Sequence, residues 1–425
     1  MSNAPYVKLR DLCDVNQGLQ IPISKRFREG GENRYFYITV QFLKDSYLEK
    51  FYVENPPQSS ICNEDDIIVV RTGSTGQIIT GVKGCFHNNF FKINYDKEKV
   101  VGKFLYYCLT SKDKKMEMKR RAGITTIPDL NHFMFLDMEI PLPEYSQQLK
   151  ATNILDVLSK KIELNNKINA ELESMAKLIY DYWFVQFDFP DEYGNPYKSS
   201  GGKMVYNEEL KREIPEGWDV IKIIDQIKLE KTGDWGKEIQ EGNYSLQVDC
   251  IRGADLNGLN GRGKVKSSNR FILEKNQHKL LSVFDIIIEI SGGSPTQSTG
   301  RMAFLTDESF QRFQKPLICS NFCKAISLKN NNYFYNFVYQ WNNLYSNGVL
   351  FGWEGKTSGI KNLLFDAFVN SHKFSEAPET LAKKFSAFVD PLHKKKQKLL
   401  LENSELESLR EWLLPMLMNG QVKIK

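Results

Sequence analysis

The feature that most constrains this chain is a repeat with a period of 234 residues. Glu171–Ser174 recurs letter for letter as Glu405–Ser408. At the same offset the lysine pair Lys160–Lys161 recurs as Lys394–Lys395. A period this long, in a chain of 425 residues, indicates two copies of one structural unit rather than a stack of short repeats.

Weaker sequence similarities precede both copies of this segment. In each pair the first member comes from the first copy: Asp66–Gly76 with Asp285–Ser294, His87–Phe90 with Cys319–Phe322, and Thr125–Leu130 with Ser358–Leu363. A β-branched run that leads into a Gly/Ser/Thr turn is typical of a strand followed by a loop. We therefore expect each copy to be a globular domain followed by a long helix.

The two helices are predicted at residues 144–186 and 378–414. Apolar residues in steps of three and four are typical of a coiled-coil seam. The predicted seam residues are Ile154, Leu158, Ile168, Leu172, Met175 and Ile179 in the first helix, and Phe385, Leu392, Leu399, Leu406, Leu409 and Leu413 in the second. Polar layers are expected at Lys161, Lys395 and Asn165. The two helices are predicted to pair antiparallel; packing of each helix on its own domain is the alternative.

The ends of these helices are predicted from caps and prolines. Ser146 and Thr380 are candidate N-caps, and Pro415 is expected to stop the second helix.

The predicted fold class is α+β, with two similar α/β domains separated by two long helices in a pseudo-two-fold internal repeat. The domains are predicted at residues 1–143 and 218–377. Turn-rich residues 187–217 are expected to form a linker, and residues 415–425 a C-terminal tail.

No catalytic constellation is predicted. Asn55–Gln58 matches three residues of an N-P-P-aromatic methylase motif, but Gln58 cannot stack on a flipped base. Pro190–Asp191 with Glu209–Lys211 has the loose spacing of a metal-dependent nuclease, but its second half lies in a polar linker. None of the five histidines has metal-ligand spacing. We expect a chain that is not an enzyme and that binds no metal or cofactor itself.

The seven cysteines include no C-x-x-C pair, and no apolar run approaches the roughly 18 residues of a membrane span. Reduced thiols and a cytoplasmic location are expected.

Basic residues cluster in both domains, with aromatic and small polar residues between them, in a chain of net charge +5. Lys and Arg suit phosphates, whereas Arg, Asn, Gln, Ser and Thr on loops suit base edges. The DNA-binding candidates in the first domain are Lys25, Arg26, Arg28, Arg34, Tyr35, Arg71, Thr72, Ser74, Thr75 and the group Lys119, Arg120 and Arg121. Those in the second are Arg262, Lys264, Lys266, Asn269, Arg270, Ser294, Thr296, Gln297, Trp353 and Lys356.

In this arrangement the chain resembles the specificity subunit of a Type I restriction-modification system, and the resemblance covers nearly its whole length. Its carriers are Ile140–Pro143, the two Glu-Leu-Glu-Ser segments, the aromatic exit Tyr182–Pro190 and the opening Glu213–Trp218. The chain departs from the family pattern at two places. The first domain lacks an Ile-Pro-x-Gly-Trp opening, and Ser375–Pro378 replaces a proline-bracketed helix entry.

The resemblance implies a subunit that binds a bipartite site on double-stranded DNA. Each domain would read one half, and the helices would set the unread spacer. Two adenine methyltransferase subunits and a restriction/translocase subunit would be its partners, and these would hold S-adenosylmethionine, ATP and Mg. The alternatives are a self-contained DNA-modifying enzyme and a coiled-coil scaffold that binds only proteins.

Overall fold

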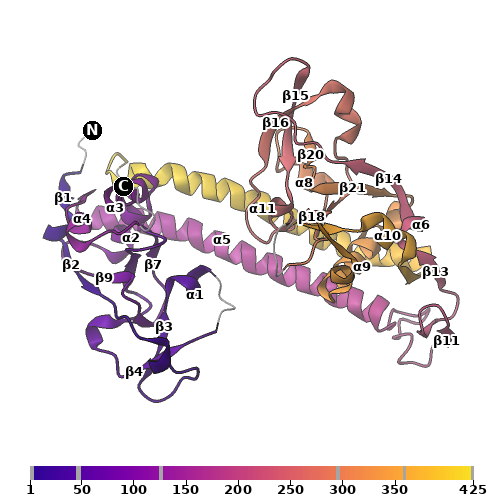
Figure 1. Ribbon diagram of the computed structural model, residues 1–425, viewed down its shortest axis with the longest axis horizontal. Coiled ribbons are helices and arrows are strands. Elements are labelled where there is room, and N and C mark those ends of the chain that lie inside the picture. The colour runs from indigo at the N-terminus through magenta and orange to yellow at the C-terminus, as the bar shows by residue number, and fades with distance from the viewer. Residues whose placement is uncertain (1–3, 45–48, 124–127, 293–296, 358–359, 423–425) are drawn as a thin grey trace. The chain divides into compact units, whose positions relative to one another are not determined.

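The computed structural model describes residues 4–44, 49–123, 128–292, 297–357 and 360–422. The chain divides into two units, residues 1–161 with 406–425 and residues 162–405. Each unit holds a domain of short strands and a stretch of both long helices, α5 (Tyr145–Tyr180) and α11 (Glu379–Met418) (Figure 1). The helices begin 234 residues apart, at the offset of the sequence repeat.

Two four-stranded sheets form the first domain. The antiparallel sheet has the order β2-β9-β6-β7 (Cys13–Gln17, Phe90–Tyr95, Ile67–Val70, Ile78–Ile79). The other has the order β4-β3-β8-β5 (Tyr52–Glu54, Arg34–Ile38, Gly84–Phe86, Ile61–Cys62), and β3 runs parallel to β8. Strands β1 and β10 pair near the domain's ends (Tyr6–Lys8, Glu139–Pro141). The helices are α1 to α4 (Val40–Lys44, Gly102–Thr110, Lys112–Ala122, His132–Leu136).

The second domain repeats this strand order. Its antiparallel sheet is β14-β21-β17-β19 (Ile227–Thr232, Cys323–Leu328, Ile286–Glu289, Met302–Phe304). Its partly parallel sheet is β16-β15-β20 (Ser268–Leu273, Tyr244–Ile251, Leu317–Cys319). Strands β13 and β24 pair as β1 and β10 do (Asp219–Lys222, Lys373–Glu376). A third sheet, β18-β23-β22 (Ser291–Gly292, Ile360–Leu363, Glu354–Thr357), is added.

The helices of the second domain are short apart from one. They are α6 to α10 (Ile223–Gln226, Leu256–Leu259, Asp307–Phe310, Phe334–Ser346, Phe365–Ser371). The predicted linker contains an antiparallel hairpin, β11-β12 (Met204–Asn207, Arg212–Pro215).

The registers confirm that the two domains are copies of one fold. Ile38 pairs with Phe86 in the first domain as Ile251 pairs with Cys319 in the second, in the parallel sense. Strands β6 and β17 occupy the same place in their sheets, as the echo between them predicts. The similar segments His87–Phe90 and Cys319–Phe322 are offset by one residue in the structure. Strand β9 begins at Phe90, the last residue of the first segment, whereas β21 begins at Cys323, one residue after the second segment.

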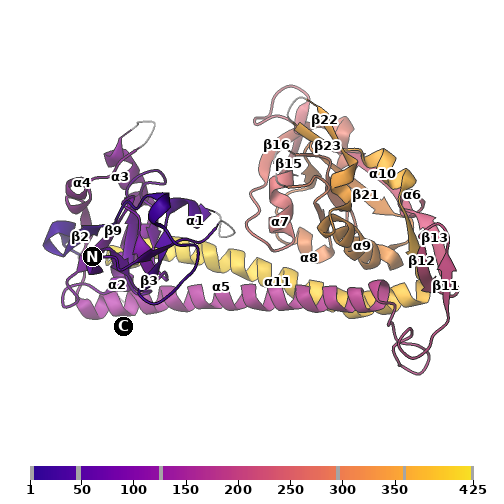
Figure 2. The ribbon, with the colours of Figure 1, turned by 60° about the horizontal axis from the view of Figure 1, so that its bottom comes forward.

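Helices α5 and α11 pair antiparallel in both units, as predicted, and lie side by side in Figures 1 and 2. As residue numbers rise along α5, those of the partners fall along α11. The contacts are Ser159–Arg410 (3.4 Å) in the first unit, and Asn165–Asn403 (2.9 Å) and Glu173–Lys396 (3.1 Å) in the second.

The predicted seam is displaced by one residue at alternate positions of α5. The buried residues of this helix include Leu155, Ile162, Asn165, Asn169, Ala176 and Tyr180. Met175 and Leu409 are wrong as seam residues, because they are 51% and 41% exposed. Lys161 and Lys395 are also exposed, and Lys396 is buried instead.

The other predicted seam residues fall on or beside the buried stripe. Phe385 and Leu399 are buried. The rest are half-buried: Ile154, Leu158, Ile168, Leu172, Ile179, Leu392, Leu406 and Leu413. Because these side chains flank the stripe on both sides, the buried face is wider than a two-helix seam.

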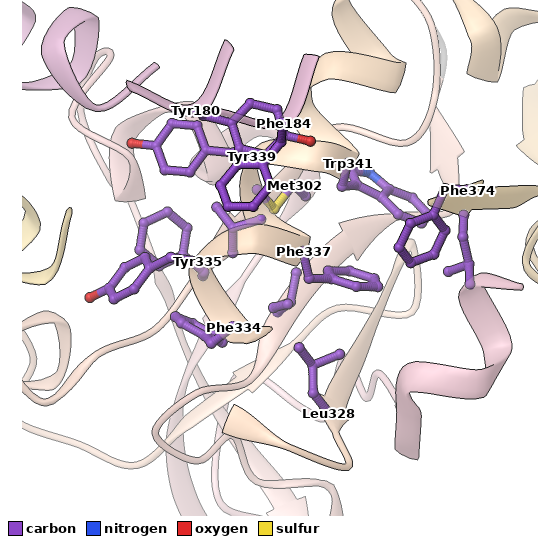
Figure 3. Packing of buried hydrophobic residues seen from close by; sticks show 14 of the residues in the cluster. Tyr180, Phe184, Met302, Leu328, Phe334, Tyr335, Phe337, Tyr339, Trp341 and Phe374 are labelled. Carbon is purple, nitrogen blue, oxygen red and sulfur yellow. The ribbon is translucent and has the colours of Figure 1, made fainter. Parts of the chain in front are cut away.

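The width has a physical cause, since α5 packs on its own domain as well as on α11. Tyr180 stacks on Tyr339 of α9 with ring centroids 5.7 Å apart (Figure 3). Tyr180 and Phe184 both lie against Phe385 of α11. Antiparallel pairing and packing on the domain, which the sequence leaves as alternatives, therefore both occur.

The predicted helix ends need correction. Helix α11 continues through Pro415 to Met418, and Leu417 and Met418 join the core of the first domain. Burial of two large side chains offsets the hydrogen bond that a proline removes. Ser146 and Thr380 are the second residues of their helices rather than N-caps. A π-helical turn, Asp181–Val185, ends the first helix.

Candidate nucleic-acid interface

The loop that follows β6 is held in place by Arg71. Its guanidinium donates to both carboxylate oxygens of Asp129, at 3.0 and 2.6 Å, and the hydroxyl of Thr72 donates to the same carboxylate at 2.6 Å. The hydrogen bond from Arg71 lowers the pKa of Asp129. Both nominated side chains are therefore engaged by Asp129 within the domain, through Nε and Nη2 of Arg71 and the hydroxyl of Thr72.

Thr75 closes the same loop from inside. Its buried hydroxyl lies 3.0 Å from the carbonyl oxygen of Arg71 and 2.9 Å from that of Pro128. Arg71, Thr72 and Thr75 thus fix the shape of the loop. Between them Gly73 is exposed and Ser74 is half-buried, so these two residues form its outer edge.

A hollow of about 670 Å³ opens between this loop and α3. It is lined by Gly73–Gln77, Lys115, Lys119, Gly123 and Pro128. Lys115 and Lys119 are one turn apart on α3, both exposed, and neither meets a carboxylate among the residues that the structure describes. Two ammonium groups beside a Ser/Thr loop form a surface that suits a phosphate.

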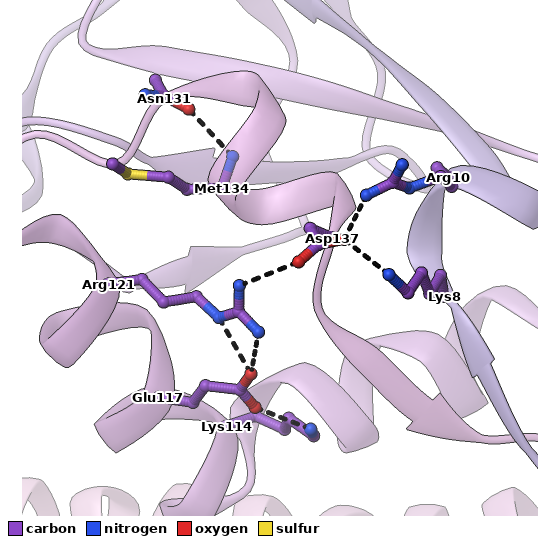
Figure 4. A network of polar contacts seen from close by, with 8 residues as sticks. All are labelled: Lys8, Arg10, Lys114, Glu117, Arg121, Asn131, Met134 and Asp137. Atoms are coloured by element: carbon purple, nitrogen blue, oxygen red, sulfur yellow. Dashed lines mark hydrogen bonds and ion pairs between the residues drawn. The ribbon is translucent and has the colours of Figure 1, made fainter.

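Arg120 and Arg121 behave differently from each other. Arg121 donates to Glu117 at 2.9 Å and to Asp137 at 3.5 Å, in a network that also holds Lys8 (Figure 4). The hydrogen bond from Lys8 lowers the pKa of Asp137. Arg120 is exposed and pairs with none of the described carboxylates.

In the group at residues 25–35, two arginines are engaged by the domain. Arg26 donates to the carbonyl of Ile21 at 2.9 and 2.7 Å and lies over the ring of Tyr37. Arg34 lies 3.6 Å above the ring of Phe27 and pairs with Glu54.

The remaining members of this group reach the surface to different extents. Arg28 is exposed and pairs with Glu49 at 3.0 Å, Lys25 is exposed, and Tyr35 is half-buried.

In the second domain, Arg270 is buried and is not available to contact a base. It lies 3.9 Å above the ring of Trp235 and pairs with Glu238 at 2.9 Å. Its neighbour Asn269 is exposed and accepts hydrogen bonds from Lys315 and Gln247.

The cations at residues 262–266 lie in two different environments. Arg262 pairs with Glu173 of α5, so it braces the domain against the helix. Lys264 and Lys266 are exposed.

The other nominated residues of the second domain lie on different elements where the structure describes them. Trp353 packs beside Phe368 at the core, Gln297 is exposed, and Lys356 belongs to β22. Ser294 and Thr296 lie outside the described residues.

Two features of these surfaces are missed by reasoning from the sequence. Lys115 belongs to the charged helix α3, where a run of lysines is typical of a solvated face. An apolar hollow of about 570 Å³ in the second domain is bordered by the exposed side chains of Trp235, Phe322 and Ile360. These three come from separate loops and strands, so no local pattern joins them.

No metal site emerges from the described parts of the chain. No three His, Cys, Asp or Glu side chains come together there as a metal site requires. None of the helices in those parts is long and apolar enough to cross a bilayer. All seven cysteines are free thiols.

Comparison with known proteins agrees with this duplicated architecture. Residues 1–174 match the family model described as Type I restriction modification DNA specificity domain. The chain is 25% identical over 367 residues to the Type I restriction enzyme MjaIX specificity subunit of Methanocaldococcus jannaschii, a match that covers 84% of this chain and 78% of that protein.

Two further relatives are consistent with this match. The MjaVIII specificity subunit of the same organism is 26% identical over 230 residues, 52% of this chain and 49% of that protein. The crystal structure of the S subunit of a Type I restriction-modification system from M. genitalium aligns over 98% of this chain and 97% of that chain, with a TM-score of 0.58 and 18% identity. That likeness shows a shared fold. Residues 1–174 therefore carry a Type I restriction modification DNA specificity domain, and over most of its length the chain is similar to Type I restriction enzyme specificity subunits.

Proposed function

We propose that this chain recognises DNA for a Type I restriction-modification complex, with each domain reading one half of a bipartite site. The observation that carries the proposal is the duplicated strand order, on which the two copies present different loops. Two domains with the same strand order but different loops can recognise two half-sites of different sequence.

In the first domain, the proposed phosphate contacts come from Lys115, Lys119 and Arg120. These cations are exposed, and none of them pairs with a described carboxylate. Ser74 and Gln77 on the adjoining loop are placed to reach base edges. Arg71, Thr72, Thr75 and Arg121 are given a supporting role instead, because their polar groups are already bonded within the domain.

In the second domain, the proposed contacts come from Lys266, Asn269 and Lys315. Asn269 joins Lys315 to Gln247 through its side-chain oxygen, which leaves its amide nitrogen for a base edge. Arg270 is proposed to hold Trp235 in place rather than to touch DNA.

The paired helices are proposed to set the spacer between the half-sites and to dock two adenine methyltransferase subunits. Each helix leaves large apolar side chains exposed on faces turned away from its partner, among them Leu164, Leu178 and Trp412. These side chains are the candidate contacts of the helices with the methyltransferase subunits.

The catalytic chemistry is proposed to belong to the partners. The methyltransferase subunits would hold S-adenosylmethionine, and a restriction/translocase subunit would use ATP and Mg. With seven free thiols the chain suits a reducing compartment, and we propose that it works in the cytoplasm.

Methylation mapping after co-expression with a cognate adenine methyltransferase subunit tests this function. The expected result is methylated adenines in a split motif, in which two halves of defined sequence are separated by a spacer of undefined sequence. Ser74→Ala/Gln77→Ala should relax selection at one half only, because these residues are the proposed base contacts, and Lys97→Ala, at an exposed lysine of the same domain, should change neither half.

Two other outcomes would contradict the proposal. Methyl transfer or DNA cleavage by the purified chain alone would indicate a self-contained enzyme. A chain without salt-dependent affinity for DNA would be a protein-binding scaffold.

A further inference from the structure

The apolar hollow of the second domain adjoins the surface that is proposed to meet DNA. Arg252 lines the hollow, and its Nη2 donates to the carbonyl oxygen of Lys266 at 2.8 Å. Trp235 also lines it and lies under the guanidinium of Arg270, which is 3.9 Å from the centre of the ring. Lys266 and Asn269, the residue before Arg270, are both proposed contacts. The walls of the hollow are therefore held against residues of the proposed interface.

The hollow presents mainly apolar side chains. Trp235, Phe322 and Ile360 are 36%, 55% and 45% exposed. Glu289 brings a carboxylate to the lining, but it is buried and accepts two hydrogen bonds from Arg301, at 2.8 and 2.7 Å. Because the guanidinium neutralises this carboxylate, the hollow can lie beside a phosphate backbone without repelling it.

The first domain carries an amide where the second carries Phe322. The backbone N–H of Arg71 donates to the carbonyl oxygen of Asn89 at 2.8 Å, and that of Ile290 donates to the carbonyl oxygen of Phe322 at 2.9 Å. Arg71 and Ile290 each follow the equivalent strand, β6 or β17. Asn89 and Phe322 therefore occupy the same place in the two copies of the fold.

Trp235 likewise has an amide as its counterpart, Gln20. The residue before Gln20 donates its N–H to the carbonyl oxygen of Phe86 at 3.0 Å, and the residue before Trp235 donates to that of Cys319 at 2.9 Å. Phe86 and Cys319 hold equivalent positions in the parallel strand pairs. In the first domain Nδ2 of Asn88 donates to Oε1 of Gln20 at 3.1 Å. The same place is thus polar in one domain and aromatic in the other.

The chemistry of the base edges limits what such a hollow can bind. In the major groove, bases present hydrogen-bond donors and acceptors, and one apolar group, the 5-methyl of thymine. Amides of Asn and Gln pair with adenine, whereas apolar side chains contact the thymine methyl. Among the groups on the base edges, only this methyl gains free energy by leaving water for an apolar hollow.

We infer that Trp235 and Phe322 recognise the 5-methyl group of a thymine in the second half-site and so determine specificity there. This inference rests on the proposed function, in which the second domain reads DNA. Arg270 is a positioning residue, because it is buried, pairs with Glu238 at 2.9 Å and fixes the indole before DNA arrives. A side chain that is already ordered loses less entropy on binding.

The test compares thymine with uracil in the split motif that methylation mapping identifies. Uracil lacks only the methyl group and keeps the O4 acceptor. The full chain with its methyltransferase subunit is titrated with duplexes in which the thymines of the second half, on both strands, are replaced one at a time. The second half is the one that Ser74→Ala/Gln77→Ala leaves unchanged. At one position the replacement should weaken binding about fourfold, as expected for one buried methyl group.

Variants of the hollow connect this effect to its residues. Trp235→Ala/Phe322→Ala should bind the thymine and uracil duplexes equally. Phe322→Ala alone should reduce the difference to about twofold, and it leaves the stack of Arg270 on the indole in place, so that the test does not depend on how the double variant folds. Phe322→Leu, which keeps an apolar side chain, should retain the preference for thymine. The matched control is Phe351→Ala, at a 57% exposed aromatic residue of the same domain outside the described lining of the hollow, and it should keep the fourfold difference.

Several results distinguish the inference from the proposed function. Equal binding of thymine and uracil by the parent at every position of the second half would overturn the inference and leave the function intact. A fourfold difference that persisted in Trp235→Ala/Phe322→Ala would do the same. If that variant lost the methyltransferase subunit but kept the thymine preference, the hollow would be a protein-docking surface instead. If the parent chain bound no split site, the proposed function itself would be wrong.

Discussion

The two recognition domains keep the same turn contacts and differ in what surrounds them. Before β6, the backbone N–H of Asn63 donates to Asp66 at 2.8 Å, and before β17 that of Ser282 donates to Asp285 at 2.7 Å. After these strands, Thr72 donates to Asp129 and Ser291 to Asn362, at 2.6 Å in both cases. The repeated contacts lie at the strand ends, where they shape the loops.

The differences lie in charge and burial. Asp285 is 1% exposed and pairs with Lys231 at 2.6 Å, whereas Asp66 is part-exposed and lies 3.8 Å from Lys92. The loop after β6 borders a basic hollow, and the loop after β17 borders an apolar one. A common set of turn contacts at the strand ends can therefore support loop surfaces of different chemistry.

The largest expected effect compares the two aspartates. Asp285→Ala leaves the Lys231 ammonium buried without its counter-charge and should destabilise the second unit by about 3–5 kcal/mol. Asp66→Ala should cost the first unit no more than about 1 kcal/mol, because its ion pair is longer and part-exposed. Calorimetric unfolding of the full chain measures both. Equal losses would show that the two turns are equivalent in energy as well as in geometry.

The next effect concerns DNA. Lys115→Ala/Lys119→Ala removes two proposed phosphate contacts, so the slope of log affinity against log salt should become shallower by roughly 1.8. A DNA titration at several salt concentrations measures this slope, with Lys97→Ala as the control. A slope unchanged from that of the parent chain would remove the basic hollow from the interface.

A smaller effect is expected for Arg71→Ala. Loss of its two charged hydrogen bonds to Asp129 should destabilise the first unit by about 1–2 kcal/mol, because the pair is part-exposed. The folded-state pKa of Asp129 is lowered, so this stabilisation is present above the unfolded pKa, near about 3.9, and is lost as pH falls through the folded value. Denaturant unfolding from pH 7 to pH 3 should therefore show the variant and the parent converging in acid. A constant difference across this range would contradict the assignment.

The smallest effect is expected for Ser291→Ala in the second domain. It removes one hydrogen bond, to the Asn362 amide oxygen, and should cost about 0.5–1.5 kcal/mol. Thr72→Val is its counterpart in the first domain and should cost somewhat more, because the acceptor there is a carboxylate. If the serine variant lost more stability than the valine variant, the neutral contact would be the stronger one.

The repeat and the helices were predictable because they depend on local patterns. A 234-residue period and steps of three and four identify two long helices without knowledge of their neighbours. The seam was displaced by one residue at alternate positions because Tyr180 and Ala176 face both α11 and the domain, and a sequence shows only that a stripe is apolar. The continuation of α11 through Pro415 was not predicted, because the burial that offsets the lost hydrogen bond involves Leu417 and Met418. These residues pack in the core of the first domain, whose other residues lie far away along the sequence.

The sequence alone was enough to identify two copies of one α+β unit, each followed by a long amphipathic helix. It also supplied the motifs that resemble Type I specificity subunits. Which cations are available to a ligand depends on contacts that form only in the folded chain. Arg71, Arg121 and Arg270 look like Lys119 or Lys266 in the sequence, yet each has its counter-charge or aromatic partner brought to it from another segment. The availability of a charge depends on neighbours in space, and the carboxylates that engage Arg121 and Arg71 lie as far as 16 and 58 residues away along the chain.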